Sequence, residues 1–363
     1  MKEIKVRLGA NSYSIVVGAG ILPVLPRRLK ALGLGRDAVV ITNPLVNRLH
    51  GKALGAALKG GGCSVKFFEV EDAERSKSAG VAAALVGRIA RYAADKKPVI
   101  VALGGGVIGD LAGFVAAVYK RGVPFVQVPT TLLAQVDSAI GGKVAVDLPE
   151  GKNLLGAFYQ PRLVLADVAL LATLSERQVR NGLAEVIKYG VIKDPALFAF
   201  VEKEHVRLLQ NDIAAMTRVV LTSAAIKARV VEQDERETRG VRTVLNFGHT
   251  LGHAIETAAG YERYQHGEAV ALGMRAACGL SSALKVMTPL EAVRVETLLT
   301  AAGLPARLEG VSPERVLAVM KFDKKFSGKK NRFVLAAGIG RTVIREGIPP
   351  ALIRRELFRM AAV

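Results

Sequence analysis

Tryptophan is absent from this chain of 363 residues, aromatic residues make up only 5% of it, and cysteine occurs twice. Cys63 and Cys278 lie far apart and in no pairing motif, so disulfides do not hold this fold together and a reducing compartment is expected. Two cysteines also exclude a zinc finger or an iron–sulfur cluster. Few aromatic side chains leave few platforms on which nucleic-acid bases can stack, and no nucleic-acid-recognition motif occurs.

An uninterrupted apolar run of the kind that crosses a membrane is also missing. The most apolar stretch, residues 99–118, is about as long as a membrane span but contains Asp110 and several glycines. It predicts a buried strand followed by a helix. Residues 1–8 alternate charged and apolar side chains, as in a half-buried strand, and lack the apolar core of a signal peptide. We therefore expect a cytoplasmic protein without a membrane partner.

Acidic residues are fewer than basic ones: the chain has 32 Asp and Glu and 51 Lys and Arg, which gives a formal charge of +19. Half of the residues are apolar, which excludes disorder, and the length suggests two domains. Such a charge suggests an anionic partner of one of three classes, namely nucleic acid, membrane surfaces or phosphorylated small molecules. The missing aromatic platforms favour a phosphorylated metabolite.

Two patterns of hydrophobicity divide the chain near residue 176. Up to that point, short β-branched runs alternate with helical stretches, the pattern of a parallel α/β sheet. After an opening hairpin, strands are expected at residues 38–42, 65–70, 99–103, 125–129 and 163–168. Long helical periodicity then dominates, followed by two late strands at residues 332–337 and 342–345. We predict an α/β domain over residues 1–176 and a mainly α-helical domain over residues 177–363.

Residues 104–110, Gly-Gly-Gly-Val-Ile-Gly-Asp, follow an apolar strand and open a helix. They satisfy the GxGxxG pattern, in which glycines let the backbone approach a diphosphate and the helix N-terminus donates N–H groups to it. A glycine-rich turn that only packs against a sheet, without binding a dinucleotide, would have the same sequence pattern. No acid follows about 20 residues later, where a dinucleotide fold places its ribose ligand, and the acidic stretch 71–74 is the nearest substitute.

Three of the five histidines fall between positions 249 and 266. His249 and His253 are spaced four apart, so on a helix they share one face and can bind a divalent zinc or cobalt ion, with His266 as a further ligand. A carboxylate or water usually completes such a shell. Spacing does not decide which carboxylate is the ligand, and the candidates are Glu185, Glu256 and Glu268.

Basic residues lie beside predicted turns and strand ends, as expected for a site that binds an anionic metabolite. They are Arg121, Lys143, Lys152, Lys188, Lys227, Arg242 and the run 321–330.

Taken together, seven segments of the chain resemble the 3-dehydroquinate synthase family over almost its whole length. The segments are residues 72–77, 104–110, 121–143, 151–158, 182–190, 242–254 and 266–270. Several long motifs in one order are far more specific than a glycine turn. The sequence departs from the family pattern at Ala73, Ala139 and residues 237–240, which are one residue longer.

The resemblance implies a Rossmann-like NAD-binding domain, a helical domain that holds one divalent metal ion, zinc or cobalt, and a homodimer. The implied metal ligands are Glu185, His249 and His266. The implied NAD-binding residues are Asp72, Glu74, Lys77, Gly104, Gly105, Gly106, Val107, Ile108, Gly109, Asp110, Thr130, Thr131, Lys143, Lys152 and Thr173. The residues implied around the substrate phosphate are Arg121, from the neighbouring subunit, Lys152, Asn153, Lys188 and Lys325. Those implied around the substrate carboxylate and hydroxyls are Asp137, Lys143, Lys188, Lys227, Arg242, Asn246 and His253.

The activity implied by the resemblance is the conversion of 3-deoxy-D-arabino-heptulosonate 7-phosphate to 3-dehydroquinate and phosphate, a carbon–oxygen lyase reaction of the shikimate pathway of aromatic amino acid biosynthesis. It proceeds by transient oxidation with NAD, phosphate elimination, re-reduction and intramolecular aldol closure, with His253 as a base. Two related activities stay open, an NAD- and metal-dependent polyol or glycerol-phosphate dehydrogenase and another sugar phosphate cyclase. From a different class, the charge of +19 also allows a nucleic-acid-binding scaffold.

Overall fold

The computed structural model describes residues 1–71, 73–322 and 331–361, and their contacts divide the chain into two compact units. The first unit comprises Met1–Ser175 and Met216–Thr238, and the second comprises Glu176–Ala215 and Arg239–Val363. Residues 216–238 therefore cluster with the first unit, whereas the sequence pattern predicts a single boundary after residue 176. The spacing of apolar residues predicts a helix there, but it does not specify the core against which that helix packs.

The first unit is built on a seven-stranded sheet with the strand order β1-β2-β9-β6-β5-β3-β4. The strands are β1 (Lys2–Val6), β2 (Tyr13–Gly18), β3 (Asp37–Thr42), β4 (Ser64–Glu69), β5 (Pro98–Gly104), β6 (Phe125–Pro129) and β9 (Leu163–Asp167). β1 pairs antiparallel with β2, and the other neighbouring pairs are parallel. The predicted parallel α/β sheet and its opening hairpin are confirmed.

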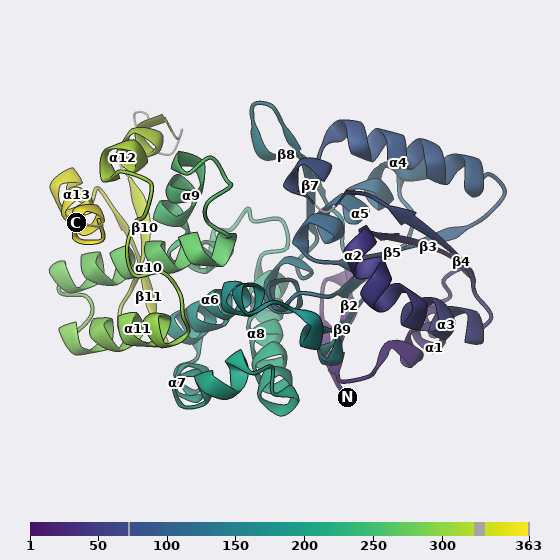
Figure 1. Ribbon diagram of the computed structural model, residues 1–363, viewed down its shortest axis with the longest axis horizontal. Coiled ribbons are helices and arrows are strands. Elements are labelled where there is room, and N and C mark those ends of the chain that lie inside the picture. Colours follow the sequence, from purple (N-terminus) through teal and green to yellow (C-terminus); the bar gives the residue numbers. More distant parts are fainter. Residues whose placement is uncertain (72, 323–330, 362–363) are drawn as a thin grey trace. The chain divides into compact units, whose positions relative to one another are not determined.

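Helices cover both faces of this sheet (Figure 1). They are α1 (Leu25–Ala31), α2 (Pro44–Val46), α3 (Lys52–Gly60), α4 (Ala79–Tyr92) and α5 (Gly106–Val118). Most of α8 (Ile213–Gln233) also belongs to this unit. Alternate residues of a strand point to opposite faces, so Val39 lies in one core with Leu85 of α4 and Val40 lies in another with Leu54 of α3. Because both faces are buried, the central strands consist of continuous apolar runs.

A separate hairpin belongs to the first unit (Figure 1). β7 (Lys143–Leu148) and β8 (Gly151–Phe158) form an antiparallel two-stranded sheet. β7 packs against α4 and α5 and buries Val144 and Val146, while β8 is exposed or half-buried along its whole length. The hydrophobic pattern does not reveal this hairpin, because β8 lacks the alternation of buried and exposed positions on which strand prediction depends.

The second unit is mainly helical, as predicted (Figure 1). Its elements are α6 (Glu176–Lys193), α7 (Pro195–Leu209), α9 (His249–Ala258), α10 (His266–Ala283), α11 (Pro289–Ala301), α12 (Pro313–Phe322), β10 (Arg332–Ala336), β11 (Thr342–Glu346) and α13 (Pro350–Arg359). The two late strands are confirmed as an antiparallel pair. α10 is buried along most of its length and contacts α6, α9, α11, α13 and β10, so it forms the centre of this unit.

Among the helices that the structure describes, none is both long enough and apolar enough to cross a membrane. The apolar stretch 99–118 forms most of β5 and all of α5, as predicted.

Candidate metal centre and active site

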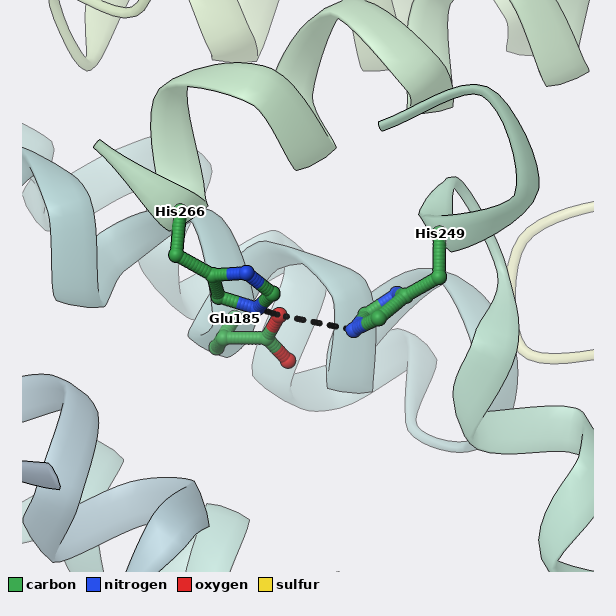
Figure 2. A group of neighbouring side chains, drawn as sticks. All are labelled: Glu185, His249 and His266. Carbon is green, nitrogen blue, oxygen red and sulfur yellow. Dashed lines mark ion pairs between the residues drawn. The ribbon is translucent and has the colours of Figure 1, made fainter. Parts of the chain in front are cut away.

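Three side chains from three helices meet in the second unit (Figure 2). Glu185 lies in α6, His249 is the first residue of α9, and His266 is the first residue of α10. Oε1 of Glu185 lies 3.6 Å from Nε2 of His249 and 3.5 Å from Nε2 of His266. One possible donor atom from each residue lies within 4.8 Å of the other two. The structure therefore brings together the three side chains that the resemblance implies as metal ligands.

The three carboxylates that spacing leaves open have different surroundings. Glu185 is fully buried and faces both imidazoles. Glu268 instead binds Arg177 at 2.7 and 2.8 Å and caps the N-terminus of α10. Glu256 lies on the other side of His266, with its Oε1 3.4 Å from Nδ1. This arrangement favours Glu185 as the ligand and Glu256 as a support for the His266 ring.

A close crossing of α9 and α10 determines how near the two histidines approach each other. A Cβ atom on Gly273 of α10 would lie 1.9 Å from the carbonyl oxygen of Gly248, so glycine is required at this position. Gly248 has a φ of 80°, a left-handed conformation that favours glycine, and it turns the chain directly before His249. The two ring centroids, of His249 and His266, are consequently 5.3 Å apart.

The protonation state of His249 suits a metal ligand. Its Nδ1–H donates to the carbonyl oxygen of Phe247, 3.2 Å away, and this leaves the lone pair of Nε2 facing Glu185. Burial, with a smaller contribution from the charge of Lys188, lowers the pKa of His249 well below its usual value. The ring is therefore neutral at pH 7, as a divalent cation requires of a histidine ligand.

His266 lies between two carboxylates, with Nε2 facing Glu185 and Nδ1 facing Glu256. Burial lowers the pKa of His266, but hydrogen bonds to Glu185 and Glu256, together with the charges of these carboxylates, outweigh this effect and raise the pKa to about 10. Such a site attracts positive charge, either a proton or a divalent cation. Two imidazole nitrogens and one carboxylate oxygen are also a known ligand set of catalytic zinc, so these residues fit such an ion.

Further predicted residues lie on elements that adjoin this cluster. The ammonium of Lys188, one turn along α6, forms an ion pair with Oε2 of Glu185, and both side chains are almost completely buried. Arg242, which is also buried, and Asn246 lie on the short helix η8 (Val241–Asn246), which contacts α6. The ring of His253 is 5.2 Å from that of His249. The second unit thus gathers two buried basic groups with the candidate ligands.

In the first unit, the glycine turn closes the carboxyl end of β5. The strand ends at Gly104, Gly105 precedes the helix, and α5 begins at Gly106, so that residues 107–109 lie in its first turn. A Cβ atom on Gly105 would lie 3.1 Å from Cγ2 of Thr131, and the backbone N–H of Thr130 donates to the carbonyl oxygen of Gly104 at 2.9 Å. The predicted residues form one compact turn at a helix N-terminus, where backbone N–H groups can bind a phosphate.

Two lysines link residues predicted for the cofactor with residues predicted for the phosphate. Nζ of Lys77 lies 2.5 Å from both Oδ2 of Asp110 and Oδ1 of Asn153. Nζ of Lys152 lies 2.9 Å from Oε1 of Glu74. Burial is the largest single influence on the pKa of Lys77 and lowers it, but the charge and hydrogen bond of Asp110, together with the charges of Glu74 and Asp147, raise that pKa overall. Burial raises the pKa of Asp110, and Lys77 offsets this only in part.

Replacing Asp110 by asparagine should destabilise the protein by about 3 kcal/mol, because the substitution leaves the buried ammonium of Lys77 without its counter-charge. The double variant Asp110→Asn with Lys77→Met should recover much of this loss, since neither charge remains. Urea denaturation of the wild type and of both variants measures the difference. A double variant as unstable as the single one would show that the ion pair is not the cause.

The predicted residues Asp137, Lys143 and Lys227 also make ion pairs within the first unit. Nζ of Lys227, on α8, lies 2.8 Å from Oδ1 of Asp137, and Lys143 pairs with Glu237. Both contacts depend on the placement of residues 216–238 with the first unit. Sequence alone predicts these residues as substrate contacts but not as partners of one another.

The sequence analysis does not assign His50, whose Nε2 lies 3.0 Å from Oγ1 of the predicted residue Thr173. No spacing rule links two positions so far apart, so only the fold reveals this contact. Arg121 is exposed at the centre of a turn in which residues 120–122 all have positive φ. Asp72 and Lys325, predicted for NAD and for the phosphate, lie outside the described residues.

Comparison with known proteins identifies the family of this chain. Residues 67–181 match the family model described as 3-dehydroquinate synthase N-terminal, and residues 182–326 match the one described as 3-dehydroquinate synthase C-terminal. The 3-dehydroquinate synthase of Pelotomaculum thermopropionicum is 49% identical over 96% of this chain and 94% of its own. That of Caulobacter vibrioides is 45% identical over 100% of both chains.

A solved structure shares the fold over almost the entire chain. It is the 2-epi-5-epi-valiolone synthase of Streptomyces hygroscopicus subsp. jinggangensis with NAD+ and Zn2+ bound, which has a TM-score of 0.88 and 27% identity and covers 99% of this chain and 98% of its own. The two family models together account for more than half of the chain, and the curated relatives extend over nearly all of it. This chain belongs to the 3-dehydroquinate synthase family.

Proposed function

We propose that this chain catalyses the 3-dehydroquinate synthase reaction with Glu185, His249 and His266 as the ligands of one divalent metal ion and residues 104–110 as part of an NAD site. The convergence of these three donor groups from three helices, in a chain of this family, carries the proposal. The valiolone synthase that shares the fold has NAD+ and Zn2+ bound. The donor set and the glycine turn of this chain fit the same two groups.

A divalent cation held by these ligands would lower the pKa of the substrate hydroxyls that it contacts, and NAD bound at the glycine turn would supply a reversible hydride acceptor. Residues of the chain supply the proton transfers and the orienting charges. His253, next to the ligand His249, accepts the proton of the substrate C5 hydroxyl. The groups that orient the substrate carboxylate and hydroxyls are Asp137, Lys143, Lys188, Lys227, Arg242 and Asn246.

The substrate phosphate is a dianion, and basic side chains bind it. Lys152 and Lys188 each form an ion pair with a glutamate, so each ammonium is already oriented in the protein. Charge-assisted hydrogen bonds from these groups, and from Arg121, Asn153 and Lys325, hold the phosphate in position for its elimination. We further propose that the enzyme acts as a homodimer in the cytoplasm.

Phosphate release from 3-deoxy-D-arabino-heptulosonate 7-phosphate tests this function. We expect one phosphate for each 3-dehydroquinate formed, no net NADH, and loss of turnover when a chelator removes the metal ion. Net NADH formation with glycerol-type substrates would instead identify a polyol dehydrogenase. Preferential turnover of a heptulose phosphate that lacks the carboxylate would identify a different sugar phosphate cyclase.

Replacing Arg121 by alanine should raise the KM for the phosphorylated substrate about 10- to 100-fold, because one hydrogen bond between charged groups contributes roughly 1.5–3 kcal/mol. The metal content should stay unchanged, since Arg121 is remote in sequence and role from the ligands. Steady-state kinetics and metal analysis measure the two quantities. Arg27→Ala removes another exposed arginine and should alter neither.

Replacing Glu256 by glutamine should weaken metal binding about 10- to 100-fold, because the carboxylate no longer orients Nδ1 of His266. Competition with a chromophoric chelator measures the affinity without reference to turnover. Glu262→Gln makes the same chemical change at an exposed position and serves as the control. Equal affinities for the two variants would contradict the supporting role of Glu256.

A further inference from the structure

A second group of potential metal ligands lies on the other side of the His266 ring from Glu185. It consists of His253, Glu256 and His266, and one donor atom from each residue lies within 4.8 Å of the other two. His253 and Glu256 are three residues apart in α9, so they share one face of that helix. The ring centroids of His253 and His266 are 6.0 Å apart. His266 therefore belongs to both groups, with Nε2 facing Glu185 and Nδ1 facing Glu256.

The donor atoms of this second group suit a divalent transition metal ion. Two imidazole nitrogens and one carboxylate oxygen are a ligand set of zinc, and bonds of about 2.0–2.2 Å at tetrahedral angles place neighbouring donors about 3.3–3.6 Å apart. Nδ1 of His266 and Oε1 of Glu256 have this spacing, at 3.4 Å. His253 is exposed, so its ring can rotate toward these two atoms and water can supply the fourth ligand.

We propose that His253, Glu256 and Nδ1 of His266 form a second site for a divalent transition metal ion, with zinc as the expected ion. The His266 ring bridges this site and the proposed site at Glu185 and His249. When only the first site is filled, Nδ1–H of His266 donates to Glu256. Binding at the second site replaces this proton, which leaves to solvent, by the metal ion.

Electrostatics makes the second site the weaker of the two. An ion on each nitrogen of one imidazole ring, at bond lengths of about 2 Å, places the two cations about 6 Å apart, where they repel each other. The deprotonated His266 ring lies between them as an anion, and the carboxylate of Glu256 adds a second negative charge. These charges offset part of the repulsion, so the second site fills only at higher metal concentration.

Occupation of the second site affects catalysis through His253. A neutral imidazole has one nitrogen that can accept either a proton or a metal ion. Once His253 binds the second ion, it no longer accepts the proton of the substrate C5 hydroxyl, so excess zinc inhibits the enzyme. This consequence rests on the proposed function, whereas the second site itself rests on the geometry of the three side chains.

Equilibrium dialysis of the full chain against buffered free zinc tests the second site. The wild type should bind one zinc ion per chain at low free zinc and two at high free zinc. His253→Gln should bind only one, because glutamine supplies no imidazole nitrogen. His205→Gln makes the same change on α7 and should bind two. A wild type that binds one ion at every concentration, or a His253→Gln variant that binds two, would overturn the proposal. Loss of one ion from His205→Gln would also overturn it.

Anomalous X-ray scattering at the zinc edge locates the two ions without reference to turnover. Crystals of the wild type in excess zinc should show two peaks per chain about 6 Å apart, one beside each nitrogen of His266. Crystals of His253→Gln under the same conditions should keep only the peak beside Nε2. A second peak that does not adjoin Nδ1 of His266 would overturn the bridged site.

Phosphate release at the same free zinc concentrations tests the consequence for catalysis. Turnover should fall at least about 100-fold as the second site fills, because a general base contributes about 10²–10⁴-fold to the rate. Excess magnesium, which prefers oxygen ligands, should leave turnover unchanged. Undiminished turnover with two zinc ions bound would contradict the role of His253 as the base and confirm that the second site is separate from it. Two bound ions in a protein that releases no phosphate at any zinc concentration would refute the proposed function and support the second site.

Discussion

Replacing His249 by alanine should remove the bound metal ion and lower turnover at least about 1,000-fold, which corresponds to the several kcal/mol that a catalytic metal contributes. The reason is geometric. Nε2 of His249 faces Oε1 of Glu185 at 3.6 Å, and the hydrogen bond from Nδ1 to Phe247 holds the ring in that orientation. Without this nitrogen, one carboxylate and one imidazole remain. Metal analysis after dialysis and the phosphate-release assay measure the two losses.

His205→Ala is the matched control for this substitution. Its Nδ1 hydrogen-bonds to the carbonyl oxygen of Glu202 in its own helix, α7, away from the candidate ligands in the sequence. The variant should keep both metal and activity. Full metal content in the His249→Ala variant would show that the ligand assignment is wrong, even if turnover were lost.

Replacing Gly273 by alanine should destabilise the protein by about 3 kcal/mol and weaken metal binding at the same time. The new Cβ atom would lie 1.9 Å from the carbonyl oxygen of Gly248 and 2.8 Å from the backbone nitrogen of Gly252. Both are backbone atoms, so α9 must move away from α10, at the upper end of the cost of overpacking a core. Because α9 begins at His249, this movement also separates that candidate ligand from His266.

Gly87→Ala is the control, since it makes the same change within α4. Only the end of the flexible Arg91 side chain lies near a Cβ at that position, at 3.8 Å. Alanine should stabilise this helix by about 0.5–1 kcal/mol relative to glycine. Urea denaturation and chelator competition give the two readouts for both variants. A Gly273→Ala variant with wild-type stability would show that the crossing of α9 and α10 can relax without cost.

Sequence predicts best those elements in which apolar residues recur at the regular spacing of a helix or a strand. The buried strands of the first unit appear as apolar runs because helices cover both faces of the sheet. β8 is not predicted, because its residues are exposed or half-buried throughout and its leucines and glycines show no alternation of apolar and polar positions. α8 is predicted as a helix, but most of it belongs to the first unit, because periodicity does not identify the core that a helix joins.

The candidate site shows the same division. The spacing of His249 and His253 within one helix makes a metal-binding cluster a reasonable prediction. Residue spacing cannot select one of the three candidate carboxylates, because Glu185 lies 64 residues before His249 in the sequence. Only the packing of α6 against α10, and of α10 against α9, places Oε1 of Glu185 within 3.6 Å of both rings.

By itself, the sequence determined the parallel sheet, the helical second part, the glycine turn at residues 104–110 and, through motifs in a fixed order, the family. These features depend on backbone geometry within a few consecutive residues or on long matching segments. The tertiary structure decided which carboxylate joins the histidines and which unit holds Lys227. Each of these depends on contacts between segments that are distant along the chain, and the packing of side chains, rather than any local period, determines such contacts.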